Sequence, residues 1–328
     1  MPDSREALVE GLSVVIPVFN SAGILPELMR RLSPVLAGTG GPFEAILVND
    51  GSHDTSWDAI CRLVSEYPWA RGLDLMRNFG QHNALLCGIR EARYATIVTM
   101  DDDLQHPPEE IPLLLQRLQE GCAVVYGYPA VAQHSLMRNL TSALAKAALQ
   151  GAMGIETARQ VSAFRAFRTE IRDAFADYRS PYVSIDVLLT WGTTRFAAIP
   201  VRHDPRHSGV SNYTWRKLLT HAINLTTGFS TWPLQLASLI GFAFTLFGMA
   251  VLGYVLIRYL IGGGVVPGFA FLASIIAVFS GAILFALGIM GEYLARMHLR
   301  SMGRPHAVIR EATPPTKSLR KELLSHEQ

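Results

Sequence analysis

The chain has 328 residues, enough for one large domain and a smaller part, and charged residues make up only 17% of it. A typical soluble domain carries roughly 25% charged residues. The net charge of +2 and the lack of a basic run mixed with aromatic residues exclude a typical nucleic-acid-binding protein. The three cysteines are odd in number and far apart, which favours free thiols in a reducing compartment. The N-terminal residues MPDSREALVEG show no secretory signal pattern.

Predicted strands and helices alternate over the first 126 residues. The segment Leu12–Phe19 is a continuous apolar and β-branched run, which is typical of a buried parallel strand. Further strands are predicted at 43–50, 70–76, 94–101 and 123–126, with helices ending near residue 36, beginning after the turn at 51–56, and at 81–92 and 108–121. This alternation predicts an α/β fold with a doubly wound, mostly parallel sheet. Ligands of such sheets bind at the carboxyl ends of the strands.

An acidic cluster follows the fourth predicted strand, where Asp101, Asp102 and Asp103 are adjacent and Gln105 lies two residues further on. Adjacent carboxylates repel one another, so a fold that keeps them together usually supplies a cation. Oxygen ligands favour Mg²⁺ or Mn²⁺ over zinc. An extended backbone would direct Asp101, Asp103 and Gln105 to one side and Asp102 to the other. A metal ion there would neutralise a leaving diphosphate. The alternative is a solvated acidic turn that caps the next helix.

Two more polar clusters follow predicted strands. In VNDGSHDTS, Asp50 could accept hydrogen bonds from a base or a ribose, and Gly51 would allow close approach. The alternative for this segment is turn chemistry and helix capping. In MRNFGQHNALLCGI, Arg77 and Asn78 lie where a diphosphate could be held.

The deficit of charge is concentrated near the C-terminus, because Leu218–Ile257 and Tyr259–Gly291 contain no Asp, Glu, Lys or Arg. Transmembrane helices are predicted at about 233–258 and 267–290. Twenty-five helical residues reach ~37 Å, which exceeds the ~30 Å hydrocarbon core of a bilayer. The short glycine-rich link predicts an antiparallel hairpin. The alternative is a pair of buried helices in a soluble core.

Basic residues flank both apolar segments on the same side. Arg206, Arg216 and Lys217 precede the first segment, and Arg296, Arg300, Arg304 and Arg310 follow the second, whereas the link contains only Arg258. The positive-inside rule then predicts a multi-pass protein of the cytoplasmic (inner) membrane, with the large domain and both termini in the cytoplasm.

These patterns divide the chain into four parts. We expect a cytoplasmic domain at 1–210, an interfacial segment at 211–231, the membrane hairpin within 232–291 and a cytoplasmic tail at 292–328. The interfacial segment mixes aromatic, cationic and apolar residues, so it could lie along the lipid headgroups or pack as an ordinary amphipathic helix against the domain. The tail after Arg310 is polar and expected to be mobile.

Several motifs occur in one order along the chain: VVIPVFN, VNDGS, RNFGQHNALLCGI, MDDDLQHPPEEIP, FRAFR, HDPRHSGVSNY and GEYLARM. Together with the two apolar segments they resemble glycosyltransferase family 2, and within it the polyprenyl-phosphate glycosyltransferases, the group of dolichol-phosphate mannose synthase and undecaprenyl-phosphate sugar transferases. The resemblance covers about residues 11–305. It implies a GT-A fold, a divalent Mg²⁺ or Mn²⁺ ion, an inverting mechanism, a nucleotide-sugar donor, a polyprenyl phosphate acceptor in a lipid membrane and self-association.

The resemblance also implies roles for single residues. The metal ligands would be Asp101, Asp103 and Gln105, and the nucleotide pocket would include Pro17, Val18, Asn20, Asp50 and Gly80, with Arg77, Asn78 and Asp102 as further candidates. The acceptor phosphate would contact Arg138, Ser142, Arg206 and Ser211, with Arg206 also counted as catalytic. Arg138 and Ser142 are four residues apart, so both would lie on one face of a helix. The alternative for that helix is a solvated amphipathic surface.

Three positions depart from the family pattern. Ser21 stands where relatives commonly have Glu, Asn49 where Asp is common, and Arg159 where relatives often carry Asp near the reacting centre. A phosphate acceptor is already anionic near pH 7, so its attack does not strictly need a base. We therefore expect Arg159 to act in catalysis by neutralising phosphate charge.

The predicted activity is inverting, metal-dependent transfer of a sugar, expected to be UDP-linked, to undecaprenyl phosphate, which makes a lipid-linked donor for cell-envelope glycans. A transferase that elongates a polysaccharide is disfavoured, because such enzymes usually have more spans and a QxxRW-like motif that this chain lacks. The alternative from another class is an inactive transferase-like subunit that binds lipid or supports a flippase. Arg159 is the feature that favours it.

Overall fold

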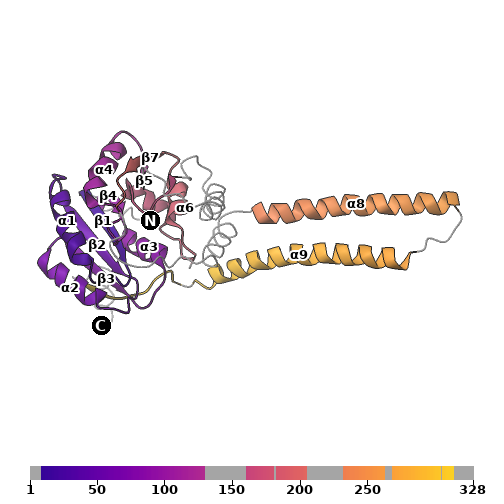
Figure 1. Cartoon of the computed structure of the whole chain (residues 1–328), viewed down its shortest axis with the longest axis horizontal. Helices are drawn as coiled ribbons and strands as arrows, with labels where there is room; N and C mark the ends of the chain where they lie inside the picture. The colour runs from indigo at the N-terminus through magenta and orange to yellow at the C-terminus, as the bar shows by residue number, and fades with distance from the viewer. Residues whose placement is uncertain are drawn as a thin grey trace, which may run out of the picture.

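The computed structural model describes residues 9–129, 160–180, 182–204, 232–262, 268–303 and 305–313. Figure 1 shows an α/β domain from which two long helices extend side by side. The predicted sites Arg138, Ser142, Arg159, Arg206 and Ser211, and the predicted interfacial segment, lie outside the described residues.

The domain contains one mixed sheet with the strand order β7-β5-β6-β4-β1-β2-β3-β8. Its strands are β1 (Val9–Val18), β2 (Phe43–Asn49), β3 (Ala70–Leu75), β4 (Tyr94–Thr99), β5 (Val124–Pro129), β6 (Arg165–Arg168), β7 (Phe196–Val201) and β8 (Ile309–Thr313). Its helices are α1 (Leu25–Ala37), α2 (Ser56–Glu66), α3 (Gln81–Glu91), η1 (Pro108–Glu110), α4 (Ile111–Gln119), η3 (Thr169–Phe175) and α6 (Ile185–Gly192). The prediction of one helix over 108–121 is corrected, because a 3₁₀ turn precedes a shorter α-helix there.

Helices cover both faces of this sheet, as the continuous apolar strands predict. Along β1 the fully buried Val14 and Ile16 pack in a core with α1, α2 and α4, whereas Val15 packs in a second core with α3 and α6. Burying each such side chain contributes roughly 1.5–3 kcal/mol. Sequential strands β1, β2 and β3 pair in parallel, which confirms the predicted doubly wound α/β sheet.

The strand order reverses direction beside β1. Its two parallel neighbours are β2 on one side and β4 on the other, so the chain leaves β1 toward β3 and then returns across it to β4. A crevice forms at the carboxyl ends of the strands where such a reversal occurs. The sequence motifs at the ends of β1, β2, β3 and β4 are thereby brought to one edge of the sheet.

The two extended helices are α8 (Trp232–Gly262) and α9 (Phe269–Ser301). Leu234–Val255 and Val278–Ser301 are long and apolar enough to cross a membrane, with mean hydropathies of 2.0 and 1.7. In the most apolar stretch of each helix only 6% and 0% of the residues are buried, whereas the core helices of a soluble protein are mostly buried. The Phe279 ring packs against Phe244 and Phe247, which holds the two helices together.

The second long helix extends beyond the apolar segment predicted to end near residue 290, because α9 continues to Ser301. In this extension the Arg296 guanidinium lies 4.8 Å from the centre of the Tyr182 ring in the α/β domain. Arg296 also forms an ion pair with Glu292 one turn earlier. The last turns of α9 therefore lie against the domain.

The segment after α9 corrects the expectation of a mobile tail after Arg310 for residues 311–313, and residues 314–328 lie outside the described part of the chain. Residues Ile309–Thr313 form β8, which pairs antiparallel with β3 at the edge of the sheet, as Figure 1 shows by the yellow strand beside β3. The Met76 amide donates to the Val308 carbonyl oxygen at 2.9 Å and continues this pairing. The chain thus returns from the long helices to the domain.

A half-buried histidine, His306, joins this returning segment to α3, and it predicts a pH effect on stability. Arg90 lies 3.0 Å from Nδ1 of His306, and burial, followed by the Arg90 charge, lowers the pKa of His306 to about 4. An unfolded histidine has a pKa near 6.5, so the unfolded chain binds more protons between pH 6.5 and 4. We therefore expect the free energy of unfolding to fall with decreasing pH across this window.

The histidine is tested by the variant His306→Gln, whose amide oxygen can still accept from Arg90. We expect a shallower loss of stability between pH 6.5 and 4 than in the wild type, measured by chemical unfolding of the purified full chain. Equal slopes for the two proteins would contradict the assignment to His306.

Candidate active site

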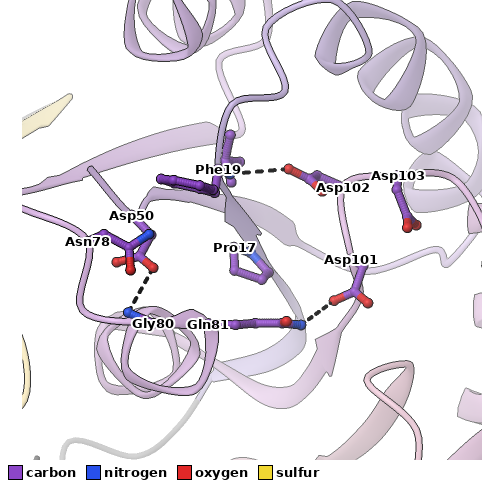
Figure 2. A pocket seen from close by; sticks show the side chains of 10 residues that line it. Pro17, Phe19, Asp50, Asn78, Gly80, Gln81, Asp101, Asp102 and Asp103 are labelled. Carbon is purple, nitrogen blue, oxygen red and sulfur yellow. Dashed lines mark hydrogen bonds between the residues drawn. The ribbon is translucent and has the colours of Figure 1, made fainter. Parts of the chain in front are cut away.

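A pocket of about 280 Å³ opens at the carboxyl ends of β1–β4. It is lined by Pro17, Val18, Phe19, Asp50, Asn78, Gly80, Gln81, Asp101, Asp102 and Asp103. Figure 2 shows Asp50 and Asn78 on one side, the three adjacent aspartates on the other and Pro17 between them. The structure therefore brings together eight of the predicted site residues: Pro17, Val18, Asp50, Asn78, Gly80, Asp101, Asp102 and Asp103.

Asp50 organises one side of this pocket. The residue is 3% exposed, and its two carboxylate oxygens accept from the amides of Phe79 at 2.7 Å and Gly80 at 2.9 Å. Burial raises the pKa of Asp50, although both amides and the Arg77 charge act in the opposite direction. A carboxylate has about four acceptor positions, so each oxygen can also accept a bond from a ligand. Asp50 thus fixes the loop before α3 and still faces the pocket.

The next residue, Gly51, explains how two loops approach so closely. Its φ of +64° lies in the left-handed region, and a Cβ there would lie 2.4 Å from the backbone carbonyl carbon of Arg77 and the nitrogen of Asn78. Only glycine avoids both the conformational cost and the collision. The loop after β2 therefore packs directly against the loop after β3.

We expect Gly51→Ala to destabilise the protein by at least about 2 kcal/mol and to weaken nucleotide binding, because the loop at Arg77 must move away. The matched control is Gly40→Ala. That position has a similar φ of +74° and open space around it, so it carries the conformational cost alone. Chemical unfolding and nucleotide titration of both variants test the difference, and equal losses would show that the contact at Arg77 has no effect.

The acidic cluster has a different shape from the one expected. Residues 102–106 form turns and bends, with Leu104 at a φ of +58°, so the extended backbone predicted for Asp101 to Gln105 is wrong. Asp102 is directed at the end of β1, where its carboxylate accepts from the Phe19 amide at 3.4 Å (Figure 2). Gln105 is not among the residues that line the pocket. The backbone N–H of Gln105 donates to Asp103 Oδ1 at 3.1 Å.

Burial makes the Asp102 carboxyl group a weaker acid than an ordinary aspartate. Desolvation raises the pKa of Asp102 to about 6, opposed by hydrogen bonds from the Ser21 hydroxyl and the Phe19 amide, while the neighbouring Asp103 charge raises it further. A cation bound in the pocket would favour the ionised form and reverse this shift.

The donor set fits a hard divalent ion in part. Three carboxylates at one pocket wall supply only oxygen, as Mg²⁺ and Mn²⁺ prefer. Asp101 is held at 2.6 Å by the Gln81 side chain, and within the described residues no three His, Cys, Asp or Glu side chains form a ready metal cage. Magnesium usually binds through one or two carboxylates and completes its shell with substrate phosphates and water. The pocket therefore suits an ion that arrives with a diphosphate.

Two other predicted nucleotide-site residues lie outside the pocket lining. Asn20, with a φ of +54°, joins two loops. Its backbone N–H donates to Ser52 Oγ at 2.9 Å, and its side-chain Oδ1 accepts from the backbone N–H of His53 at 2.8 Å. The Arg77 guanidinium lies 4.1 Å from the centre of the Phe79 ring. In this structure these two side chains shape the pocket's loops and do not line it.

Sequence reasoning missed two residues that line the pocket, Phe19 and Gln81. Both carried a signal, because each lies inside a motif and next to a predicted strand or helix end. Phe19 forms an edge-to-face contact with His53 at 6.1 Å between ring centres. Gln81 begins α3 and donates to the Asp101 carboxylate, so it links the two walls of the pocket.

A buried ion pair supports the strand that carries the acidic cluster. Arg165 on β6 is 1% exposed, pairs with Asp186 on α6 and donates to Thr99 Oγ1 at 3.0 Å. The Tyr126 hydroxyl donates to the same Asp186 at 3.1 Å. Thr99 ends β4, two residues before Asp101, so this network fixes the base of the cluster.

A polar pocket with clustered carboxylates lies at the strand reversal of a doubly wound sheet, which is where sheets of this class bind their ligands. The chain matches the family described as Glycosyl transferase family 2 over residues 13–175. It is 34% identical over 313 residues to the undecaprenyl-phosphate 4-deoxy-4-formamido-L-arabinose transferase of Pseudomonas aeruginosa (strain LESB58), covering 94% of this chain and 92% of that relative. The transferase of the same name from Klebsiella pneumoniae (strain 342) is 33% identical over 321 residues, covering 96% and 97%.

The chain belongs to glycosyl transferase family 2, and it is a glycosyltransferase. The solved structure of glucosyl-3-phosphoglycerate synthase from Mycobacterium tuberculosis with Mn²⁺ and UDP-glucose shares the fold, with a TM-score of 0.50 and 18% identity over 66% of this chain and 77% of that one. The expected GT-A type of fold is confirmed.

Proposed function

We propose that this chain transfers a sugar from a UDP-linked donor to undecaprenyl phosphate, with inversion at the anomeric carbon. The observation that carries the proposal is one polar, carboxylate-walled pocket in the same chain as two exposed apolar helices. A water-soluble donor needs the first, and an acceptor embedded in lipid needs the second. The names of the relatives agree with this acceptor and make 4-deoxy-4-formamido-L-arabinose the first sugar to test.

The donor would lie across the carboxyl ends of β1–β4. Asp50 holds the loop at Phe79 and Gly80 and offers its remaining acceptor positions to the base or the ribose. Pro17 and Val18 add apolar groups to the pocket lining, and Asn78 adds a polar one. These groups are fixed before the donor arrives, so binding it costs little reorganisation.

Asp101 and Asp103 would hold the Mg²⁺ or Mn²⁺ ion, with Gln105 as a further candidate ligand. When bound, the ion supplies neutralisation of the charge that develops on the diphosphate as it leaves. The Gln81 side chain donates to the Asp101 carboxylate at 2.6 Å, and the backbone N–H of Gln105 donates to Asp103. Both carboxylates are therefore oriented by the protein.

The acceptor would enter from the membrane side. A phosphate oxygen of the acceptor attacks the anomeric carbon, the bond from that carbon to the diphosphate oxygen breaks, and nucleoside diphosphate leaves. The phosphate is already anionic, so this step requires positioning and charge neutralisation more than a base. Arg138, Ser142, Arg159, Arg206 and Ser211 are the proposed contacts for it, with the domain and both termini on the cytoplasmic side.

The test is an assay of the purified full chain with undecaprenyl phosphate, Mn²⁺ and a panel of nucleotide-sugars that includes UDP-4-deoxy-4-formamido-L-arabinose. We expect a lipid-linked sugar to form with one donor, and chelation of the metal by EDTA to stop it. Binding of undecaprenyl phosphate without turnover of any donor would instead support an inactive lipid-binding subunit. Transfer to a soluble acceptor in preference to the lipid would reject the proposed acceptor.

A further inference from the structure

Strand β8, which follows the second long helix, carries an ion pair to β3 near its first residue. Arg310 on β8 donates through Nε to Asp74 Oδ2 at 2.6 Å, and a second nitrogen of its guanidinium contacts the same oxygen. The Arg310 side chain is 56% exposed, whereas Asp74 is fully buried. A buried carboxylate needs donors around it, and Arg310 is a charged one.

The same carboxylate reaches the loop of the pocket through one amide. Asn49 Nδ2 donates to Asp74 Oδ1 at 2.7 Å, and these two residues are register partners on β2 and β3. Because the amide nitrogen faces Asp74, the Asn49 oxygen faces the other way, where it accepts from the Ser52 amide at 3.3 Å. Ser52 Oγ in turn accepts from the Asn20 amide at the end of β1.

Asp50 follows Asn49 directly, so this chain of contacts fixes the backbone that presents a pocket-lining carboxylate. It also accounts for the asparagine at position 49. An aspartate there would place two carboxylates opposite each other on neighbouring strands, with no amide to donate between them. The Asn49 side-chain amide joins Asp74 to the loop at 49–53, whereas the carboxylate of an aspartate at position 49 would repel Asp74.

On this basis we propose that Arg310 is a positioning residue of the donor site, acting through Asp74 and Asn49 on the loop at 49–53. The inference rests on the proposed function and adds the β8 strand to the nucleotide-binding machinery. Ser301 ends α9 and Ile309 begins β8, so the segment that leaves the long helices supplies this residue. The donor pocket and the helix pair are thereby joined through one short stretch of chain.

The first test is Arg310→Gln in the purified full chain, with UDP and Mn²⁺ as the binding probe. We expect the Kd for UDP to rise about tenfold, with the KM for undecaprenyl phosphate unchanged. The matched control is Glu311→Gln, which removes a charge from the next residue of the same strand. Glu311 is exposed and outside the contact chain described above, so its variant should bind UDP like the wild type.

Two further variants separate positioning from general stability. Asp74→Asn should weaken UDP binding by a similar factor, and Asp74→Asn/Arg310→Gln should be no worse than the more damaging single variant, because both act through one contact. Arg310→Lys keeps a cation and should recover most of the affinity. Additive losses in the double variant, or a Kd in Arg310→Gln equal to that in Glu311→Gln, would overturn the proposal.

Hydrogen exchange without nucleotide gives an independent result. We expect the amides of peptides spanning 49–53 to exchange faster in Arg310→Gln than in Glu311→Gln, because the Ser52 amide loses its fixed acceptor. Equal exchange would overturn the positioning role even if nucleotide binding changed. If the wild type fails to bind UDP or to transfer a sugar, the proposed function fails, and the exchange experiment still decides the role of Arg310.

Discussion

Asp103→Asn is expected to lower kcat by about 10³-fold, while the protein keeps its fold. The variant keeps the size of the side chain and removes the negative charge that would hold the metal ion beside the leaving diphosphate. The backbone N–H of Gln105 donates to Asp103 Oδ1. The side-chain oxygen of an asparagine at position 103 can accept the same hydrogen bond, so the turn should survive. Turnover at several Mn²⁺ concentrations, together with thermal unfolding, measures both effects.

The control for this variant is Asp58→Asn on the exposed surface of α2, which removes one carboxylate away from the pocket. It should leave kcat unchanged. High Mn²⁺ should restore part of the activity of Asp103→Asn if the loss lies in metal affinity. Full turnover of Asp103→Asn at ordinary Mn²⁺ would remove Asp103 from the proposed metal site.

Arg165→Met is expected to have the largest effect on stability, a loss of about 3–5 kcal/mol in the free energy of unfolding. Asp186 is 6% exposed, and among the described residues the Tyr126 hydroxyl would be left as the hydrogen-bond donor to its charge. Thr99 would also lose its bond from Arg165 directly below the acidic cluster, so activity should fall as well. Chemical unfolding of the purified chain measures the first effect.

Two variants show whether burial of the Arg165–Asp186 pair causes the loss of stability expected for Arg165→Met. Arg30→Met removes one partner of the exposed pair with Glu27, whose members are 70% and 43% exposed, and should lower the free energy of unfolding far less than Arg165→Met does. Arg165→Met/Asp186→Leu removes both buried charges and should recover most of the stability that Arg165→Met loses. A single variant as mild as Arg30→Met would show that the buried pair contributes little.

The strands that form the centre of the sheet were readable from local pattern. The run predicted at Leu12–Phe19 became β1 over Val9–Val18, and those predicted at 43–50, 70–76 and 94–101 became β2, β3 and β4 within two residues at each end. Their side chains are buried on both faces, so continuous apolar runs marked them. Polar residues that end such runs predicted the edge where the pocket lies.

The antiparallel strands were not readable in the same way. β6 is a four-residue strand with two arginines, and β8 follows the apolar helices within a polar stretch. Neither has an apolar run of its own, because β6 is short and β8 pairs at the edge of the sheet. Such strands are defined by their partners, which lie far away in the sequence.

The geometry of the acidic cluster also depended on contacts between distant residues. Spacing alone predicted that Asp102 would point away from Asp101 and Asp103, whereas the turn at Leu104 and the amide of Phe19 place all three at one pocket. The Phe19 amide is 83 residues from Asp102 along the chain. A local rule for alternating side chains holds only while the backbone stays extended.

The sequence by itself determined the α/β class, the central parallel strands, the two apolar helices and the polar clusters at the strand ends. These features follow from local patterns of burial and polarity, which depend on neighbouring residues only. The resemblance to a family added Pro17, Val18 and Gly80 to the predicted pocket. The tertiary structure alone decided the turn of the acidic cluster, the buried Arg165–Asp186 pair and the return of Arg310 to Asp74. Each of these depends on residues that meet only after the chain has folded, and pairing across such separations leaves no periodic signal in the sequence.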